Sequence, residues 1–298
     1  MTIRSPRFGG SMVALATPFK DGAIDWSAFA AMIERQITHG SSALVPCGSS
    51  GEAATLTHEE HTEVVRFVVE QARGRVPVVA GTGSNATAEA IRLTREAKRV
   101  GASAALMISP YYNRPTQEGI RRHYLAVADA AGLPIILYNI PGRTGSRIEA
   151  ETIAALASHP NIIGLKESDQ LDHTLDVVHQ VPADFEIYAG DDSTTLTVIA
   201  LGGAGVITTI GNLVPREMAD LAAAALANDF ARARELQRRL FPLMRSCFTE
   251  TNPIPLKYGL ALLGLCRDEL RLPLVAMTDP GRQAALAASL RGLGLLAS

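Results

Sequence analysis

Lysine is rare in this chain, which otherwise uses arginine as its cation. Of its 28 lysines and arginines, only four are lysine: Lys20, Lys98, Lys166 and Lys257. Arginine keeps its proton in a protein, whereas lysine can lose its proton and act as an amine nucleophile. Lys166 ends the apolar run Ile162–Lys166, where loss of solvation favours the neutral amine. We expect a Schiff base on Lys166, with a structural ion pair to a neighbouring carboxylate as the alternative.

Further polar and aromatic side chains follow other apolar runs. The loop Gly48-Ser-Ser-Gly-Glu52 precedes a helical stretch, and its amides can bind an anion such as a keto-acid carboxylate, unless it is an ordinary capped loop. Tyr138 ends a run and faces the same side as the lysine if the registers match. Arg143 can bind a carboxylate through two hydrogen bonds, although a surface position is the default for arginine. Adjacent Tyr111 and Tyr112 are more typical of interface packing than of catalysis.

The elements that must position these residues alternate between short apolar runs and amphipathic helical stretches. Near-continuous apolar strands are typical of a parallel sheet that is covered on both faces. Eight such units in about 210 residues predict a (β/α)8 TIM barrel rather than a doubly wound sheet, with the active site at the C-terminal ends of the strands. The expected strands are Met12–Thr17, Ala43–Cys47, Val76–Gly81, Ala104–Ser109, Pro134–Asn139, Ile162–Lys166, Phe185–Ala189 and Gly205–Thr209.

Two parts of the chain are expected, a barrel over residues 1–228 and a C-terminal helical extension over residues 229–298. The helix at Pro215–Ala227 can complete the outer ring of the barrel. The run Gly202-Gly-Ala-Gly205 resembles a phosphate loop, but it precedes the eighth strand and so belongs at the opposite end of the barrel. This position weakens the reading of the chain as a phosphosugar isomerase.

Composition excludes several other classes. The chain has 298 residues, 47% of them hydrophobic, and a net charge of −2 without any long basic run, so we expect no nucleic-acid or membrane partner. No apolar stretch reaches the roughly 20 residues of a membrane span, and the N-terminus lacks a signal-peptide core, which predicts a cytoplasmic protein. Cys47, Cys247 and Cys266 match neither a disulfide framework nor a metal site.

Longer motifs resemble one known family. Ser109–Gly119, which reads SPYYNRPTQEG, and Leu137–Gly145, which reads LYNIPGRTG, look like the dihydrodipicolinate synthase family of Schiff-base pyruvate enzymes. Ala80–Ala90, Gly190–Asp192 and Asn252–Lys257 match the same family, and the similarity covers nearly the whole chain.

The resemblance implies an activity and roles for residues. The family is made of lyases that condense pyruvate with L-aspartate 4-semialdehyde to 4-hydroxy-tetrahydrodipicolinate, in lysine and diaminopimelate biosynthesis. Lys166 would form the imine with pyruvate, and Tyr138 would transfer protons to and from it. Ser49 would relay protons to Tyr112 of a neighbouring subunit. Arg143 would bind the carboxylate of the semialdehyde, and the pyruvate would be held by Gly48, Ser50 and Ile207.

The resemblance also implies an assembly and a regulatory site. The family forms homotetramers, built as dimers of dimers, and uses no metal or organic cofactor because the lysine imine is the electron sink. Some members are inhibited by L-lysine at an interface cavity. The matching positions are Ala53, His58, His61, Asn85, Glu89 and Tyr111, although the two histidines are equally well read as ordinary surface residues.

Two departures from the family pattern leave the aldehyde substrate open. Ser49-Ser50 stand where the family usually has two threonines, so the β-branch that restricts the hydroxyl rotamer is missing. Ser168–Asp172 replaces a usually small segment beside the second-substrate pocket. The alternatives are another pyruvate-dependent lyase, such as N-acetylneuraminate lyase or a 2-keto-3-deoxy-sugar-acid aldolase, and a catalytically silent regulatory barrel. An arginine at position 143 favours the synthase.

Overall fold

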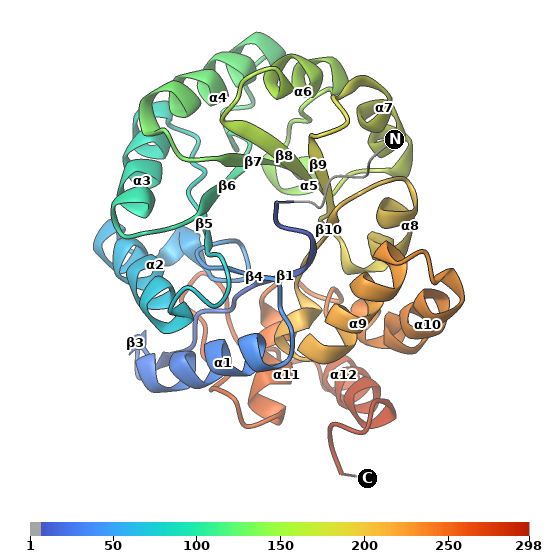
Figure 1. Ribbon diagram of the computed structural model, residues 1–298. Coiled ribbons are helices and arrows are strands. Elements are labelled where there is room, and N and C mark those ends of the chain that lie inside the picture. The colour runs from blue at the N-terminus through green and yellow to red at the C-terminus, as the bar shows by residue number, and fades with distance from the viewer. Residues whose placement is uncertain (1–6, 298) are drawn as a thin grey trace.

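Eight parallel strands surrounded by helices form the centre of the molecule (Figure 1). The computed structural model describes residues 7–297. The strands are β1 (Gly10–Ala14), β4 (Ala43–Val45), β5 (Val79–Gly81), β6 (Ala104–Ile108), β7 (Ile135–Asn139), β8 (Ile162–Glu167), β9 (Glu186–Ala189) and β10 (Gly205–Thr208). The predicted TIM barrel with a C-terminal helical extension is confirmed.

The sheet closes on itself through a bridge between its two end strands. Its strand order is β4-β1-β10-β9-β8-β7-β6-β5, and a parallel bridge between Leu44 and Val78 joins the two ends. At the junction of β1 and β10, a Cβ on Gly205 would lie 2.0 Å from the carbonyl oxygen of Gly10, so only glycine fits there. Gly202–Gly205 thus serves as the turn into β10, at the N-terminal end of the barrel as predicted.

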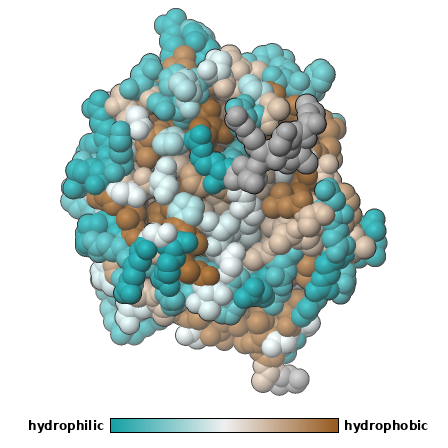
Figure 2. Space-filling model, viewed as in Figure 1, coloured by the Kyte–Doolittle hydropathy of each residue, from teal (hydrophilic) through white to brown (hydrophobic). Residues whose placement is uncertain are grey.

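The helices of the ring follow the strands in chain order. They are α1 (Trp26–Thr38), α2 (His58–Ala72), α3 (Thr87–Arg99), α4 (Gln117–Ala131), α5 (Pro141–Thr144), α6 (Ala150–Ala157), α7 (Leu171–Gln180), α8 (Thr195–Ala200) and α9 (Pro215–Leu226). The extension holds α10 (Phe230–Ser246), α11 (Ile254–Leu262) and α12 (Pro280–Gly292), which lie outside the ring in Figure 1. Figure 2 shows mainly hydrophilic residues along the helical rim. Within residues 7–297, no helix is long and apolar enough to span a membrane.

Alternation along the strands separates two apolar layers. Met12, Ile136 and Ile207 belong to a cluster inside the barrel, whereas Val13 and Leu137 belong to the larger cluster between the strands and the helices. Neighbouring residues of a strand point to opposite faces, so each strand contributes to both layers. Near the C-terminal ends of the strands the inner layer includes polar side chains such as Lys166 and Tyr138, and the site lies there.

Strand β8 departs from strict alternation. Ile135 and Ile136 of β7 pair with Ile162 and Gly164, so Ile163 is an extra residue that forms a bulge. Ile163 points into the barrel, yet Leu165, two residues later, points outward. The bulge reverses the facing of everything after it, which turns the next residue inward.

The first strand lies earlier in the chain than expected. The prediction was Met12–Thr17, but β1 covers Gly10–Ala14. The apolar run continues beyond the strand because Leu15 and Ala16 are also buried, and Ala16 donates its amide to the Oδ1 atom of Asn212 rather than to a neighbouring strand. A short antiparallel hairpin then forms from β2 (Phe19–Lys20) and β3 (Ala23–Ile24).

A buried ion pair fastens the extension to the barrel. The Nζ atom of Lys257 on α11 lies 2.5 Å from a carboxylate oxygen of Glu52, with 0% and 1% of the two side chains exposed. Lys257 also donates to the carbonyl oxygen of Glu269, and the amide of Arg271 donates to the other oxygen of Glu52. The guanidinium of Arg271 pairs with Glu60 at 2.6 Å. These contacts hold the segment after α11 against the loop that follows β4.

Replacing Lys257 by methionine should destabilise the fold strongly. The side chain keeps its approximate volume, but the Glu52 carboxylate is left buried without its counter-charge, a change that costs about 3–5 kcal/mol. Denaturant unfolding at fixed protein concentration measures the loss. The matched control is Glu52→Gln/Lys257→Met, which removes both charges and should recover most of the stability. Equal stability of Lys257→Met and the parent would contradict the role of the ion pair.

Candidate active site

Lys166 and Tyr138 lie side by side on the inner face of the barrel. They are direct partners in the register between β8 and β7, and the Nζ atom of Lys166 lies 4.3 Å from the centroid of the Tyr138 ring. Only 5% of Lys166 and 7% of Tyr138 is exposed. The registers of the two residues match, so an amine and a phenol share one largely desolvated space at the C-terminal ends of the strands.

A cavity opens above this pair. Three segments line it around Lys166. The loop after β4 contributes Gly48, Ser49 and Ser50, α5 contributes Arg143, and the turn after β9 contributes Gly190 and Asp191. The remaining lining residues are Ala14, Leu106, Tyr138, Ile140, Thr209, Phe248 and Asn252. An amine, a phenol, two hydroxyls and a guanidinium converge on one small space, which suits a short substrate with a carbonyl and a carboxylate.

The loop Gly48–Glu52 is fixed by contacts at both of its ends. A Cβ on Gly81 would lie 2.1 Å from the carbonyl oxygen of Cys47, so the loop packs directly on the backbone of β5. Cys47 itself adopts a φ of 57°, a left-handed conformation that turns the chain sharply into the loop. At the far end Glu52 is held by the ion pair to Lys257. The serine hydroxyls are thus presented by a rigid loop.

Asn252 links the loop to the arginine. Its Nδ2 atom donates to the Oγ atom of Ser50 at 2.9 Å, and its carbonyl oxygen accepts from the Nη2 atom of Arg143 at 2.9 Å. Asn252 lies in the segment between α10 and α11, so the extension supplies part of the cavity wall together with Phe248. Although Arg143 is exposed, this hydrogen bond holds its guanidinium group at the cavity.

Two acidic residues follow β9 near the lysine. Burial raises the pKa of Asp191, and the nearby positive charge of Lys166 opposes that rise. Asp192 is fully buried, and burial raises its pKa to about 6 although it accepts hydrogen bonds from the amides of Thr209 and Ile210. Asp192 therefore anchors the end of β10, whereas Asp191 lines the cavity and is a nearby carboxylate for the amine.

Two of the predicted site residues do not line this cavity. Tyr112 is 90% exposed and adopts a φ of 71°, so its ring projects away from its own chain. Ile207 is fully buried in the layer inside the barrel. Sequence reasoning gave no role to Asp191, Thr209, Phe248 or Asn252, which do line it. Asp191 and Asn252 lie within family motifs, which is a signal, whereas nothing in the sequence distinguishes Phe248 from other apolar residues.

The residues matched to a lysine-binding site lie around the start of α2 and α3. The Nε2 atom of His58 lies 2.7 Å from Glu89, and Asn113 donates to the carbonyl oxygen of Asn85. Ala53 is half-buried, and Tyr111 is 36% exposed. His61 is buried, and its Nε2 atom is bound to the carbonyl oxygen of Gly81 at 2.7 Å. His58, rather than His61, is thus the accessible histidine of this group.

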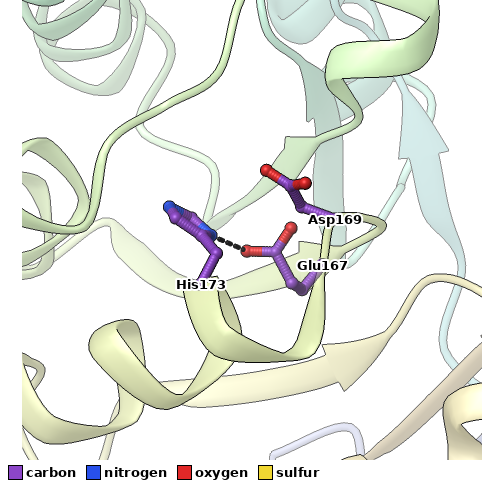
Figure 3. Close-up of side chains that lie close together, drawn as sticks. All are labelled: Glu167, Asp169 and His173. Atoms are coloured by element: carbon purple, nitrogen blue, oxygen red, sulfur yellow. Dashed lines mark hydrogen bonds and ion pairs between the residues drawn. The ribbon is translucent and has the colours of Figure 1, made fainter.

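The segment Ser168–Asp172 turns away from the cavity. Ser168 packs on the backbone, since a Cβ on Gly190 would meet its hydroxyl at 2.0 Å. Asp169 forms an ion pair with Arg147. Glu167, directly before this segment, lies 2.9 Å from the Nδ1 atom of His173, directly after it. Figure 3 shows this contact with Asp169 beside it. Glu167 and His173 of this group are buried and Asp169 is partly buried.

Comparison with known proteins identifies the family. The model of the dihydrodipicolinate synthetase family matches residues 7–291. A 4-hydroxy-tetrahydrodipicolinate synthase of Maridesulfovibrio salexigens is 49% identical over 291 residues, which cover 97% of this chain and 99% of that protein.

Solved structures agree with this match over the whole fold. Chloride-inhibited dihydrodipicolinate synthase from Acinetobacter baumannii, complexed with pyruvate, has a TM-score of 0.95 and 40% identity, covering 97% of this chain and 100% of that chain. The enzyme from Cyanidioschyzon merolae with lysine bound has a TM-score of 0.93 and 38% identity, covering 97% and 99%. The chain belongs to the dihydrodipicolinate synthetase family.

Proposed function

We propose that this protein condenses pyruvate with L-aspartate 4-semialdehyde to form 4-hydroxy-tetrahydrodipicolinate, through a Schiff base on Lys166. The observation that carries the proposal is the buried amine of Lys166 beside the phenol of Tyr138, at the bottom of a cavity lined by hydroxyls and an arginine. The names of the relatives and the pyruvate complex of one of them support it. The condensation is a step of lysine and diaminopimelate biosynthesis.

The first half-reaction joins pyruvate to the lysine. The neutral amine of Lys166 attacks the keto carbon of pyruvate, and loss of water leaves an imine. Tyr138 lies within reach to give and take the protons of these steps, and Ser49 continues the relay. Ser50 and the loop amides after Gly48 hold the carboxylate, and Ile207 keeps its place in the proposal only as the pyruvate-binding position that the family resemblance implies. The imine draws electrons from the methyl carbon, so a proton leaves and an enamine forms without a metal or organic cofactor.

The second half-reaction makes the carbon–carbon bond. The enamine carbon attacks the aldehyde carbon of the semialdehyde, which restores the imine and leaves a hydroxyl group. The amino group of the semialdehyde then attacks the imine carbon, closes the ring and releases Lys166. Arg143, held by Asn252 at the rim of the cavity, binds the carboxylate of the semialdehyde. One water molecule is lost overall, in the step that forms the first imine.

Trapping of the imine tests the proposal directly. Incubation with pyruvate and borohydride should reduce the imine to a stable secondary amine, and mass spectrometry should place the added mass on Lys166. Lys166→Arg keeps a charge but lacks the amine nucleophile and should give no adduct. An unmodified Lys166, or an adduct on one of the other three lysines, would exclude this mechanism.

Arg143→Leu should separate the two substrates. The rate of adduct formation with pyruvate should stay near that of the parent, while kcat/KM for the semialdehyde should fall by about 10- to 100-fold, since a charge-assisted hydrogen bond contributes about 1.5–3 kcal/mol. Arg121→Leu on the exposed face of α4 is the matched control. An unchanged kcat/KM for the semialdehyde would show that its carboxylate binds elsewhere. Turnover of neuraminate or a keto-deoxy-sugar acid in its place would favour those lyases.

Assembly completes the proposal. Tyr112 projects from its own chain with 90% of its surface exposed, and in this proposal it reaches the cavity of a second copy and receives the relay from Ser49. A homotetramer of the family's type places such pairs of chains together. The substrates are small, polar and metabolic, in keeping with a cytoplasmic location.

Inhibition by L-lysine is a second proposal, which the relative with lysine bound supports. The carboxylate of Glu89, whose pKa is lowered by hydrogen bonds from Ser84 and His58, is an anion for the amino group of the ligand. Asn85 lies in the loop directly before α3, the helix that carries Glu89, and Ala53, His61 and Tyr111 are the other positions that the family resemblance matches. The ligand's amino group would displace His58 from Glu89, and the imidazole of His58 would then bind the carboxylate of the ligand.

Millimolar L-lysine should therefore lower the turnover of the parent, with D-lysine as the control ligand. Glu89→Gln should remove the inhibition and leave uninhibited turnover near that of the parent, because Glu89 lies outside the cavity at Lys166. Turnover that L-lysine does not change would dismiss this regulatory site.

A further inference from the structure

A second pair of side chains lies directly behind Lys166 and Tyr138. Asn139 and Glu167 are the next residues of β7 and β8, and they are partners in the same register. Because successive side chains of a strand point to opposite faces, this pair points outward while the catalytic pair points inward. The Nδ2 atom of Asn139 donates to the Oε1 atom of Glu167 at 2.9 Å, and both residues are buried. This bond is a cross-strand link at the last paired residues of β7 and β8.

A neighbouring segment fixes the orientation of the Asn139 side chain in this link. The Oδ1 atom of Asn139 accepts from the amide of Ile148 at 3.0 Å, so its amide nitrogen must be the group that faces Glu167. The second oxygen of Glu167 is 2.9 Å from the Nδ1 atom of His173 on α7, the contact drawn in Figure 3. Burial raises the pKa of Glu167, although the hydrogen bond to His173 opposes the rise. Burial alone would lower the pKa of His173, but the hydrogen bond and the charge of Glu167 raise it.

A cation site is the competing interpretation of this cluster. Ligand atoms of Glu167, Asp169 and His173 lie within 4.8 Å of one another. Both oxygens of Asp169, however, already bind the guanidinium of Arg147, whose positive charge lies at the cluster. Both oxygens of Glu167 face hydrogen-bond donors from Asn139 and His173. The two carboxylates are thus already paired with an amide, an imidazole and a guanidinium, which disfavours a cation site, and the buried Nε2 atom of His173 has no hydrogen-bond partner among the described residues.

We propose that Asn139, Glu167 and His173 form a positioning network that holds Lys166 and Tyr138 at their reactive separation. The inference rests on the proposed Schiff-base function of Lys166. The backbone ladder between β7 and β8 gives way to loops directly after the pair, where the amide of Ser168 donates to the carbonyl oxygen of Asn139. The side-chain link therefore adds a restraint to the backbone hydrogen bonds at the ends of the two strands. Displacement of a catalytic group by about 1 Å can cost on the order of 100-fold in rate.

An isosteric exchange of the two partners tests the network. Asn139→Asp replaces the donor by an oxygen, so two carboxylates face each other, and the strand ends should separate. The double variant Asn139→Asp/Glu167→Gln restores the link with its direction reversed. The new amide nitrogen donates to Asp at position 139, and its oxygen accepts from His173, while the aspartate still accepts from Ile148. Because adjacent carboxyls can share a proton, the assays are done at alkaline pH.

The readouts are the rate of pyruvate-adduct formation with borohydride and kcat, each per folded protein. Asn139→Asp should lower both by at least about tenfold, and the double variant should return both to within about threefold of the parent. Asp169→Asn is the matched control, because it removes the ion pair to Arg147 in the same segment but leaves the link intact, and it should stay near the parent. Circular dichroism and the melting temperature establish the folded fraction.

Each outcome has one meaning. A folded Asn139→Asp that forms the adduct at the parental rate, or a folded double variant that stays as slow as Asn139→Asp, would overturn the positioning network. Glu167→Gln alone keeps an oxygen that accepts from Asn139, so it should lose less activity than Asn139→Asp. A larger loss in Glu167→Gln than in Asn139→Asp would assign the effect to the charge of Glu167 and would also overturn the positioning network. Failure of the parent itself to form a pyruvate adduct would instead reject the proposed function.

Discussion

The register between β7 and β8 is the constraint on which the whole site depends. Tyr138 and Lys166 meet because they are paired residues of adjacent parallel strands, and they face inward because of the bulge at Ile163. Without the extra residue, alternation from Ile163 would turn Lys166 outward, among the helices and away from Tyr138. A single irregularity in one strand therefore decides whether the amine lies in a cavity or in the outer apolar layer.

The same register organises both faces of the sheet. On the inner face it brings an amine beside a phenol, and on the outer face it brings an amide beside a carboxylate. The outer pair is buried under α7 and the segment before α6, so helices that never touch the cavity are connected to its geometry. The helical layer is thus tied by hydrogen bonds to residues adjacent to the reactive ones.

Much of this arrangement could be predicted from local sequence. Eight apolar runs, the rarity of lysine and the residues at the strand ends indicated the barrel and the position of Lys166, since these features depend on short-range periodicity. Three features could not be predicted in this way. The bulge at Ile163 is marked only by Gly164, because a glycine within an apolar run is compatible with a bulge but does not fix its position. The early end of β1 depends on Asn212, almost 200 residues away, which captures the amide of Ala16. Asn252 and Phe248 enter the cavity through packing of the extension, which periodicity does not report.

The ion pair between Glu52 and Lys257 has a consequence for the order of events during synthesis. A nascent chain that has emerged only through β10 contains Lys166 and all eight strands, but it lacks Phe248, Asn252 and the cation that neutralises Glu52. The wall that orients Ser50 and Arg143 is added with the last fifth of the polypeptide. A reactive amine thus acquires its selective surroundings last, and a chain that stops early lacks both this wall and the counter-charge of Glu52.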